Sequence, residues 1–214
     1  MSLLNRQQFT SFAPKAILNT LPALEAAIIA YPQLADKEVL DDWLGQMHVE
    51  SAGFSTMVEN LNYSVDSLIA LFSRARISLA DAQHFGRIDK VVNGKKVVVR
   101  QANQSAIANL IYGGAWGKEH LGNTEPGDGW KYRGSGFKQI TGRYNTEKSG
   151  FTPDELRGDV FKSALAAAQF FVSRGCIGPA KAGDIREVTR LINGGQNGYD
   201  DRVARTVAAR KVIL

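Results

Sequence analysis

The feature that most constrains the fold is an apolar stripe at helical spacing between residues 35 and 47. The stripe consists of Leu40, Trp43, Leu44 and Met47. Positions i, i+3, i+4 and i+7 fall on one face of an α-helix, so this segment predicts a helix with one buried side. A mainly helical fold follows.

The stripe leads into residues 48–64, HVESAGFSTMVENLNYS, which contain two glutamates. If the helix continues to Glu50, this residue lies within about 20° of Val39 on the apolar side, because each residue turns the helix by about 100°. Burial and the negative end of the helix dipole both disfavour a charged carboxylate. We therefore expect a raised pKa for Glu50 and a role as proton donor.

Glu59, the second glutamate, lies among Asn60, Asn62 and Ser64. A carboxylate stays ionised in such a polar setting, and two acids in opposite environments can act as general acid and general base. Taken alone, the same residues also fit a structural acid at a helix end and an ordinary surface acid.

Composition narrows the class of protein. A chain of 214 residues, of which 44% are hydrophobic, can form one large domain or two lobes that share a core. The formal charge of +5 favours an anionic partner. The single cysteine, Cys176, excludes an internal disulfide framework and a cysteine-built metal site. No export signal or membrane-spanning run is visible, so we expect synthesis in the cytoplasm.

Periodicity and helix breakers predict helices along most of the chain. They are expected at residues 6–12, 15–31, 35–51, 64–74, 78–86, 102–112, 154–174, 184–193 and 200–212. Asn93-Gly94 between two valine-rich runs predicts a hairpin over Asp89–Arg100. Gly113–Tyr144 has little helical period and many aromatic residues, which suits either a sugar-binding loop or a structural loop with core aromatics.

Three ordered segments resemble those of glycoside hydrolase family 19. GDGWKYRGSGFKQITGRYN, residues 127–145, resembles the signature loop of the family. Residues 49–64 resemble its catalytic segment, as found in phage endolysins, and INGGQNGYDDR, residues 192–202, resembles its C-terminal segment. The resemblance implies a mainly α, lysozyme-like two-lobed helical fold with a small β-hairpin insertion and a central cleft. We expect a single catalytic domain over residues 1–214 without a separate wall-binding module.

The resemblance also implies roles for individual residues. By position, Glu50 matches the general acid of the family, and Glu59 matches the base of its phage-type members. Gln139 and Thr141 match positions that bind sugar or orient the attacking water, and Asn193 matches a substrate-contacting amide. Further cleft residues are expected at Tyr63, Trp130 and Tyr132. Because the implied reaction inverts the anomeric centre, the two carboxyls should stand about 6.5–9.5 Å apart.

Two positions depart from the family pattern. Val49 replaces the histidine that usually precedes the catalytic glutamate, and His48 lies one residue earlier. A helical step of about 100° should turn His48 away from the site. Ser135 stands where the signature loop usually has arginine, so we expect one cationic substrate contact to be missing.

The resemblance therefore implies an endolysin of the lysozyme type that hydrolyses β-1,4 bonds in peptidoglycan glycan strands. We expect a monomer that uses no metal or organic cofactor, binds no nucleic acid, and waits in the host cytoplasm until a holin permeabilises the membrane. The alternatives are a chitinase that cleaves N-acetylglucosamine polymers and a non-catalytic cell-wall-binding protein.

Three smaller patterns suggest other functions. His48-Val49-Glu50 fits the start of a zinc-deaminase signature, but that chemistry needs a cysteine pair that the chain lacks. Gly134-Ser135-Gly136 lacks the lysine and the strand–helix context of a phosphate loop. The C-terminal segment predicts either a basic amphipathic helix that contacts the anionic envelope or a docked helix with a solvated face. Its basic residues are Arg202, Arg205, Arg210 and Lys211.

Overall fold

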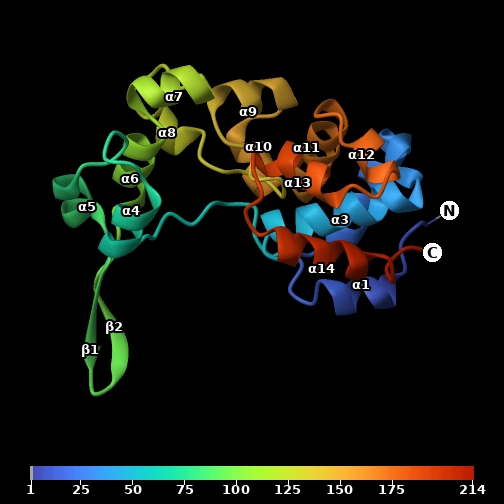
Figure 1. Cartoon of the computed structure of the whole chain (residues 1–214), viewed down its shortest axis with the longest axis horizontal. Coiled ribbons are helices and arrows are strands. Elements are labelled where there is room, and N and C mark those ends of the chain that lie inside the picture. Colours follow the sequence, from blue (N-terminus) through green and yellow to red (C-terminus); the bar gives the residue numbers. More distant parts are fainter. Residues whose placement is uncertain (1) are drawn as a thin grey trace. The chain divides into compact units, whose positions relative to one another are not determined.

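The computed structural model describes residues 2–214, which separate into two compact units. Unit 1 contains the chain up to Val58, Ser135–Gln139 and Ser149–Leu214, and unit 2 contains Glu59–Gly134 and Ile140–Lys148. Figure 1 shows that helices dominate both units and that the only sheet among the described residues is one hairpin. The predicted mainly helical class with a hairpin insertion is therefore confirmed.

Unit 1 is built around α3. Its elements are α1 (Arg6–Phe12), α2 (Thr20–Ala30), the 3-10 helix η1 (Pro32–Ala35), α3 (Lys37–Glu50), α10 (Pro153–Gly158), α11 (Val160–Ser173), α12 (Ile177–Lys181), α13 (Ile185–Asn193) and α14 (Tyr199–Ala209). The most extensive helix pairings are α3 with α14 and α2 with α11. All four residues of the predicted apolar stripe are fully buried, so α3 contributes its expected face to the core.

Unit 2 has a smaller core of its own. Its elements are α4 (Val65–Leu71), α5 (Leu79–Phe85), β1 (Ile88–Val92), β2 (Lys95–Arg100), α6 (Gln104–Ile111), α7 (Gly114–Leu121), α8 (Asp128–Lys131) and α9 (Arg143–Ser149), whose last residue belongs to unit 1. The buried centre is formed by Leu61, Leu68, Ile77, Ala82, Ile107, Ala108 and Ile111. Side chains from α4, α5 and α6 therefore meet in this core.

The largest differences between the predicted and the observed helices lie in three segments. The helix expected over 15–31 begins only at Thr20, because Asn19 adopts a left-handed conformation with φ 68° and the Ile17 N–H bonds to the Phe54 carbonyl at 2.9 Å. The helix expected over 154–174 is two helices. Asp159 ends α10, and its carboxylate caps α11 by accepting from the backbone N–H groups of residues 161 and 162.

The third difference lies in Gly113–Tyr144, where the sequence predicts little helix. This segment contains α7, α8 and the start of α9. Each of these helices has at most eight residues. Helices this short show barely two turns of periodicity, so the pattern in the sequence is weak.

The hairpin prediction is confirmed. β1 pairs with β2 in antiparallel register around Asn93-Gly94, with Val92 opposite Lys95 and Val91 opposite Lys96. Asn93 and Gly94 have φ values of 51° and 74°, the pair of left-handed residues that a type I′ turn requires. Within residues 2–214, no helix combines the length and the hydropathy needed to cross a bilayer.

Candidate active site

Glu50 is the last residue of α3, where the chain leaves the helix through an unusual turn. Ser51 holds this turn, since its hydroxyl donates to the Met47 carbonyl at 2.6 Å and accepts from the Phe54 N–H at 2.9 Å. Ala52, Gly53 and Phe54 then follow with φ values of 50°, 77° and 57°. Two of these residues are not glycine, so the turn stores backbone strain that the surrounding packing must hold.

Burial of the Phe54 side chain helps to hold this strained turn in place. The Phe54 ring is fully buried, with its centroid 5.3 Å from that of Phe137 and 6.0 Å from that of Phe9. The Gly136 N–H also donates to the Met57 carbonyl at 2.8 Å, and Val58 bridges to Ser135. The signature loop thus lies beside the segment that follows Glu50, although about 80 residues separate them in sequence.

The Glu50 carboxylate is held between two cations. Its Oε2 accepts from Lys138 Nζ at 3.0 Å, and its Oε1 accepts from Arg202 Nη2 at 2.6 Å. All three side chains are nearly buried, with exposed fractions of 10% for Glu50, 8% for Lys138 and 5% for Arg202. Arg202 Nη1 also donates to Gln46 Oε1 at 2.7 Å, one turn earlier on α3.

These two cations were missed by the sequence argument for Glu50. Burial and the helix end can be inferred from the local sequence, whereas the ion pairs with Lys138 and Arg202 cannot. Both residues lie inside the quoted motifs, Lys138 in KQITG and Arg202 in GYDDR. Their position in the motifs was the available signal, but only the fold shows that both side chains reach one carboxylate.

The burial of Arg202 also changes the interpretation of the C-terminal helix as a basic surface. The sequence placed it with the basic residues of an amphipathic helix, but it is only 4% exposed and faces α3. Arg205 pairs with Asp201 at 3.1 Å, and Arg210 pairs with Asp41 at 2.7 Å. The structure therefore shows α14 docked against α3.

His48 points away from Glu50, as expected. Its Nε2 lies 3.1 Å from the Phe12 carbonyl oxygen, and its ring packs 4.6 Å from the Phe12 ring. Burial lowers the pKa of His48. The histidine therefore belongs to the packing between α1 and α3 and does not replace the neighbour that the family usually has.

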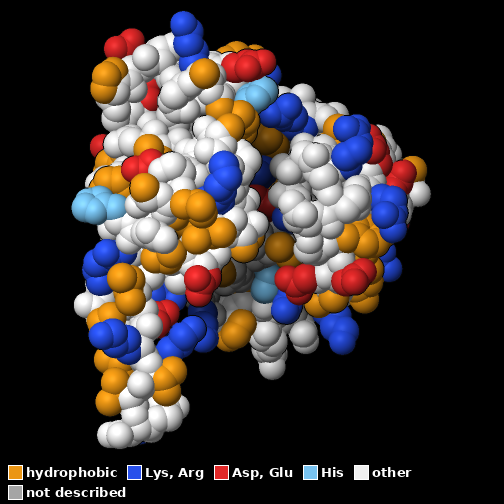
Figure 2. Space-filling view, turned by 60° about the vertical axis from the view of Figure 1, so that its left-hand side comes forward, with side chains coloured by type: hydrophobic (Ala, Val, Ile, Leu, Met, Phe, Trp, Pro, Cys, Tyr) orange, Lys and Arg blue, Asp and Glu red, His pale blue; other side chains and the backbone are white. Residues whose placement is uncertain are grey.

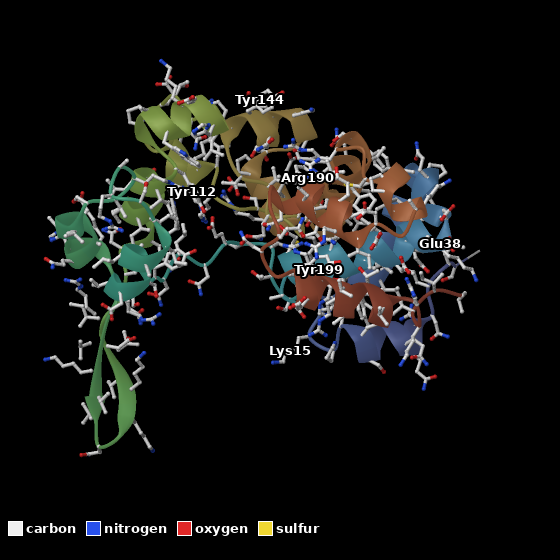
Figure 3. The ribbon with its side chains drawn as sticks, viewed as in Figure 1. Lys15, Glu38, Tyr112, Tyr144, Arg190 and Tyr199 are labelled. Atoms are coloured by element: carbon white, nitrogen blue, oxygen red, sulfur yellow. The ribbon has the colours of Figure 1, made fainter. Side chains whose placement is uncertain are left out.

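Glu59, in unit 2, is held by neutral donors. Tyr112 Oη donates to Glu59 Oε1 at 2.6 Å, and the Gly134 N–H donates to Oε2 at 2.8 Å. The Glu59 N–H in turn donates to the Gly134 carbonyl at 3.1 Å. Tyr112, labelled in Figure 3, is the C-cap residue of α6.

The polar setting of Glu59 therefore differs in origin from the one expected. Asn62 donates to Gln101 and accepts from the Ala102 N–H, while Ser64 caps α4. The donors to the carboxylate come from Tyr112 and Gly134, distant in sequence from Glu59. Both hydrogen bonds fix the orientation of the carboxylate, which a general base requires.

Two tyrosines respond to the Glu59 charge. Burial and the nearby Glu59 raise the pKa of Tyr112, so its hydroxyl stays protonated and remains a donor. Burial, followed by the charge of Glu59, also raises the pKa of Tyr63. Tyr63, an expected cleft residue, is thus near the base candidate in unit 2.

The expected aromatic residues differ in accessibility. Trp130 is partly exposed, and the Arg133 guanidinium lies 3.5 Å from its ring centroid. Tyr132 is only 5% exposed and has the Arg143 guanidinium 4.9 Å from its ring. Trp130 is therefore partly accessible to solvent, whereas Tyr132 is not.

The remaining expected residues are distributed over both units. Gln139 belongs to unit 1 and has a left-handed φ of 55°, with its amide donating to the Gly136 carbonyl at 3.0 Å. Thr141 belongs to unit 2, and its carbonyl accepts from Asn145 at 2.9 Å. Asn193 ends α13 in unit 1 and donates to the Asn197 carbonyl at 3.5 Å.

Ser135 replaces the usual arginine, but a guanidinium is still present beside it. Arg157 of α10 donates from Nε to the Ser135 hydroxyl at 2.9 Å. The Arg157 side chain is 12% exposed and also pairs with Asp154 at 3.2 Å. Among the described residues, no group of His, Cys, Asp and Glu side chains has the arrangement of a metal site.

Comparison with curated proteins finds a relative that matches almost the whole chain. A glycosyl hydrolase family 19 domain-containing protein of Haemophilus influenzae is 30% identical over 206 residues, which cover 94% of this chain and 92% of that protein. No family model matches the chain.

Solved structures with a similar fold include chitinases. A bacterial family 19 chitinase has a TM-score of 0.55 at 17% identity, with 96% of this chain and 94% of that chain covered. Chitinase C from Streptomyces griseus has a TM-score of 0.55 at 14% identity, with 98% of this chain and 76% of that chain covered. A chitinase C mutant has a TM-score of 0.57 at 14% identity, with 98% and 92% covered.

Proposed function

Since this chain belongs to glycosyl hydrolase family 19, we propose that it is an endolysin whose substrate is the β-1,4-linked glycan of bacterial peptidoglycan. Membership of the family makes it a glycoside hydrolase that acts on β-1,4 glycans. The finer assignment to peptidoglycan draws on the phage-like sequence of the catalytic segment and on the positive net charge, which suits an anionic envelope.

One observation carries the catalytic assignment. The catalytic segment contributes Glu50, the signature loop contributes Lys138, and the C-terminal segment contributes Arg202. Three motifs far apart in sequence thus converge on a single carboxylate in unit 1. A structural acid at a helix end would not require such a nearly buried arrangement, so we assign Glu50 as the residue that transfers the proton.

In this proposal, Glu50 protonates the leaving glycosidic oxygen and Glu59 activates the attacking water. Lys138 and Arg202 each donate to one oxygen of Glu50 and so fix the orientation of its carboxyl group. Each Glu59 oxygen retains a free acceptor site beyond the bond from Tyr112 or Gly134, which leaves room for a water molecule. Direct attack by such a water inverts the anomeric centre.

The first prediction concerns the two acids. Glu50→Gln should abolish the release of reducing ends from purified peptidoglycan and retain the fold, because an amide cannot donate the proton. Glu59→Gln should lower the rate by at least about 100-fold through loss of the base. Circular dichroism checks the fold of each variant. Activity of Glu50→Gln near the wild-type level would refute the acid assignment, and retained anomeric configuration in products observed by NMR would refute direct water attack.

The substrate is tested with two polymers in parallel. We expect turbidity loss and new reducing ends on purified peptidoglycan, and much slower release of reducing ends from chitin. The reverse preference would establish the chitinase alternative, which the similarity to solved chitinases favours. Tight pelleting with peptidoglycan but no hydrolysis of either polymer would establish a wall-binding protein.

The place of action is part of the proposal. We propose synthesis in the host cytoplasm and access to the wall after a holin permeabilises the membrane. Expression of the protein with and without a membrane-permeabilising agent tests this step. Lysis only with the agent supports it, and lysis without the agent contradicts it.

A further inference from the structure

The β1–β2 hairpin leaves five aliphatic side chains about half or more exposed. The exposed fractions of its valines are 72% for Val91, 51% for Val92, 44% for Val97, 45% for Val98 and 50% for Val99. Figure 1 shows the hairpin extending away from the helices of unit 2, and Figure 2 shows orange and blue side chains along it. Five exposed valines in so short a segment constitute an apolar surface without a partner in the described chain.

Valines and lysines share both faces of this hairpin. Residues paired across an antiparallel ladder point to the same side. Val91 is paired with Lys96, while Val92 is paired with Lys95 on the opposite face. Neither face is purely apolar, so the hairpin is not suited to packing onto a hydrophobic core.

The positive charge of the protein is concentrated in the same segment. Residues 87–100 contain five basic side chains and one acidic side chain, which gives +4 of the net +5 of the whole chain. The acidic residue, Asp89, is paired with Arg87 at 3.0 Å, and Lys96 lies 3.8 Å from it. The rest of the chain is therefore nearly neutral, and an anionic partner would be drawn mainly to the hairpin.

We propose that this hairpin binds the surface of an anionic lipid bilayer. The valines would enter the boundary between headgroups and acyl chains, and the lysines would extend their charged ends to lipid phosphates. Sugar chains are recognised by aromatic rings and amides, and the only such side chain from Ile88 to Arg100 is Asn93 at the turn. Lysines in both strands disfavour pairing of their outer edges with a second copy of the chain.

The C-terminal helix α14 is a second basic segment with which the hairpin can be compared. Arg202 is buried, and Arg205 and Arg210 are paired with aspartates, so this basic segment offers less uncompensated charge than the hairpin. Val207 of α14 is nevertheless 50% exposed, which equals the exposure of Val99. Val207 and the following Lys211 are therefore matched control positions.

The test is co-sedimentation of the full chain with lipid vesicles. We expect binding to phosphatidylcholine vesicles that contain phosphatidylglycerol, weaker binding at high salt, and little binding to pure phosphatidylcholine. The double variant Lys90→Gln/Lys95→Gln should bind the anionic vesicles about 25-fold more weakly, at about fivefold for each lysine. The triple variant Val91→Thr/Val92→Thr/Val97→Thr keeps β-branched side chains and should weaken binding by at least about tenfold.

The controls separate this inference from the proposed function. Val207→Thr and Lys211→Gln should bind vesicles as the wild type does, and all variants should keep the same circular dichroism spectrum. Absence of vesicle binding, equal binding to neutral and anionic vesicles, or wild-type binding by both hairpin variants would overturn the proposal. So would loss of peptidoglycan pelleting by hairpin variants that still bind vesicles, because the hairpin would then be a glycan contact. Vesicle binding is measured without hydrolysis, so either proposal can fail alone.

Discussion

At the scale of single residues, two carboxylates are held by different chemistry. Glu50 has two cationic partners at 3.0 and 2.6 Å, whereas Glu59 has a phenol and a backbone N–H at 2.6 and 2.8 Å. A nearly buried ion pair stabilises a fold weakly, but removal of one partner leaves a charge uncompensated and costs about 3–5 kcal/mol. The surroundings of Glu50 are therefore sensitive to conservative substitutions.

Arg202→Lys tests the geometry around Glu50. An arginine reaches Gln46 and Glu50 at once through two nitrogens, and a lysine ammonium cannot reproduce this planar fork. We expect kcat/KM on peptidoglycan to fall by about 10- to 100-fold, with a smaller loss of stability. Arg205→Lys, on the same helix but partly exposed and paired with Asp201, should change neither quantity. Equal effects of both substitutions would contradict the role of Arg202.

Tyr112→Phe tests the surroundings of Glu59. The substitution removes one donor to the carboxylate and leaves the bond from Gly134 in place. We expect kcat to fall by about tenfold, because Glu59, the proposed base, would be less restrained and less well oriented toward water. Tyr144→Phe is a suitable control, since Tyr144 is 62% exposed. Unchanged kcat in Tyr112→Phe would show that Gly134 alone orients Glu59.

At the scale of elements, the close packing of α3 and α14 positions Arg202. Gly45 permits this packing, since a Cβ at this position would lie 2.5 Å from Thr206 Oγ1 and 2.6 Å from the Thr206 backbone nitrogen. Thr206 is one helical turn beyond Arg202. Movement of α14 away from α3 would therefore withdraw Arg202 from Glu50.

The substitution Gly45→Ala tests how closely α3 packs against Thr206 of α14. Alanine normally favours a helix over glycine by about 1 kcal/mol, but the overlap with Thr206 should reverse the sign and destabilise unit 1 by about 1–3 kcal/mol. Activity should fall with it, because Arg202 moves. Gly178→Ala in α12 is the matched control, since a Cβ there meets nothing within 4 Å. Urea unfolding gives both free energies, and a stabilised Gly45→Ala variant would contradict the close packing.

At the scale of the whole molecule, unit 1 has a polar interior as well as an apolar one. Asp42 is 1% exposed and accepts from Thr206 Oγ1 at 3.2 Å. Burial, together with the nearby charge of Asp41, raises the pKa of Asp42 to about 7. The protonated form is therefore the one that the fold accommodates best.

This carboxyl should make stability depend on pH. Its folded pKa of about 7 exceeds its ordinary value of 3.8, so its contribution is fully present below about pH 4 and is lost as the pH rises through 7. From about pH 5 to about pH 8, the wild type should lose up to about 3 kcal/mol of unfolding free energy through this group. Asp42→Asn should remove that part of the pH dependence and be the more stable protein at about pH 8. Parallel pH profiles of the two proteins in urea unfolding would refute the assignment.

The sequence by itself determined the helical class, the face of α3 that is buried, and the hairpin with its turn. These features depend on local periodicity, on turn chemistry and on residues adjacent in the chain. Only the tertiary structure decided which groups surround each acid. Lys138 and Arg202 lie 88 and 152 residues from Glu50, and Tyr112 lies 53 residues from Glu59. Such contacts arise from the packing of distant elements, which no local pattern encodes. For the same reason the sequence alone suggests that Arg202 is a surface residue, whereas the packing of α14 against α3 buries it.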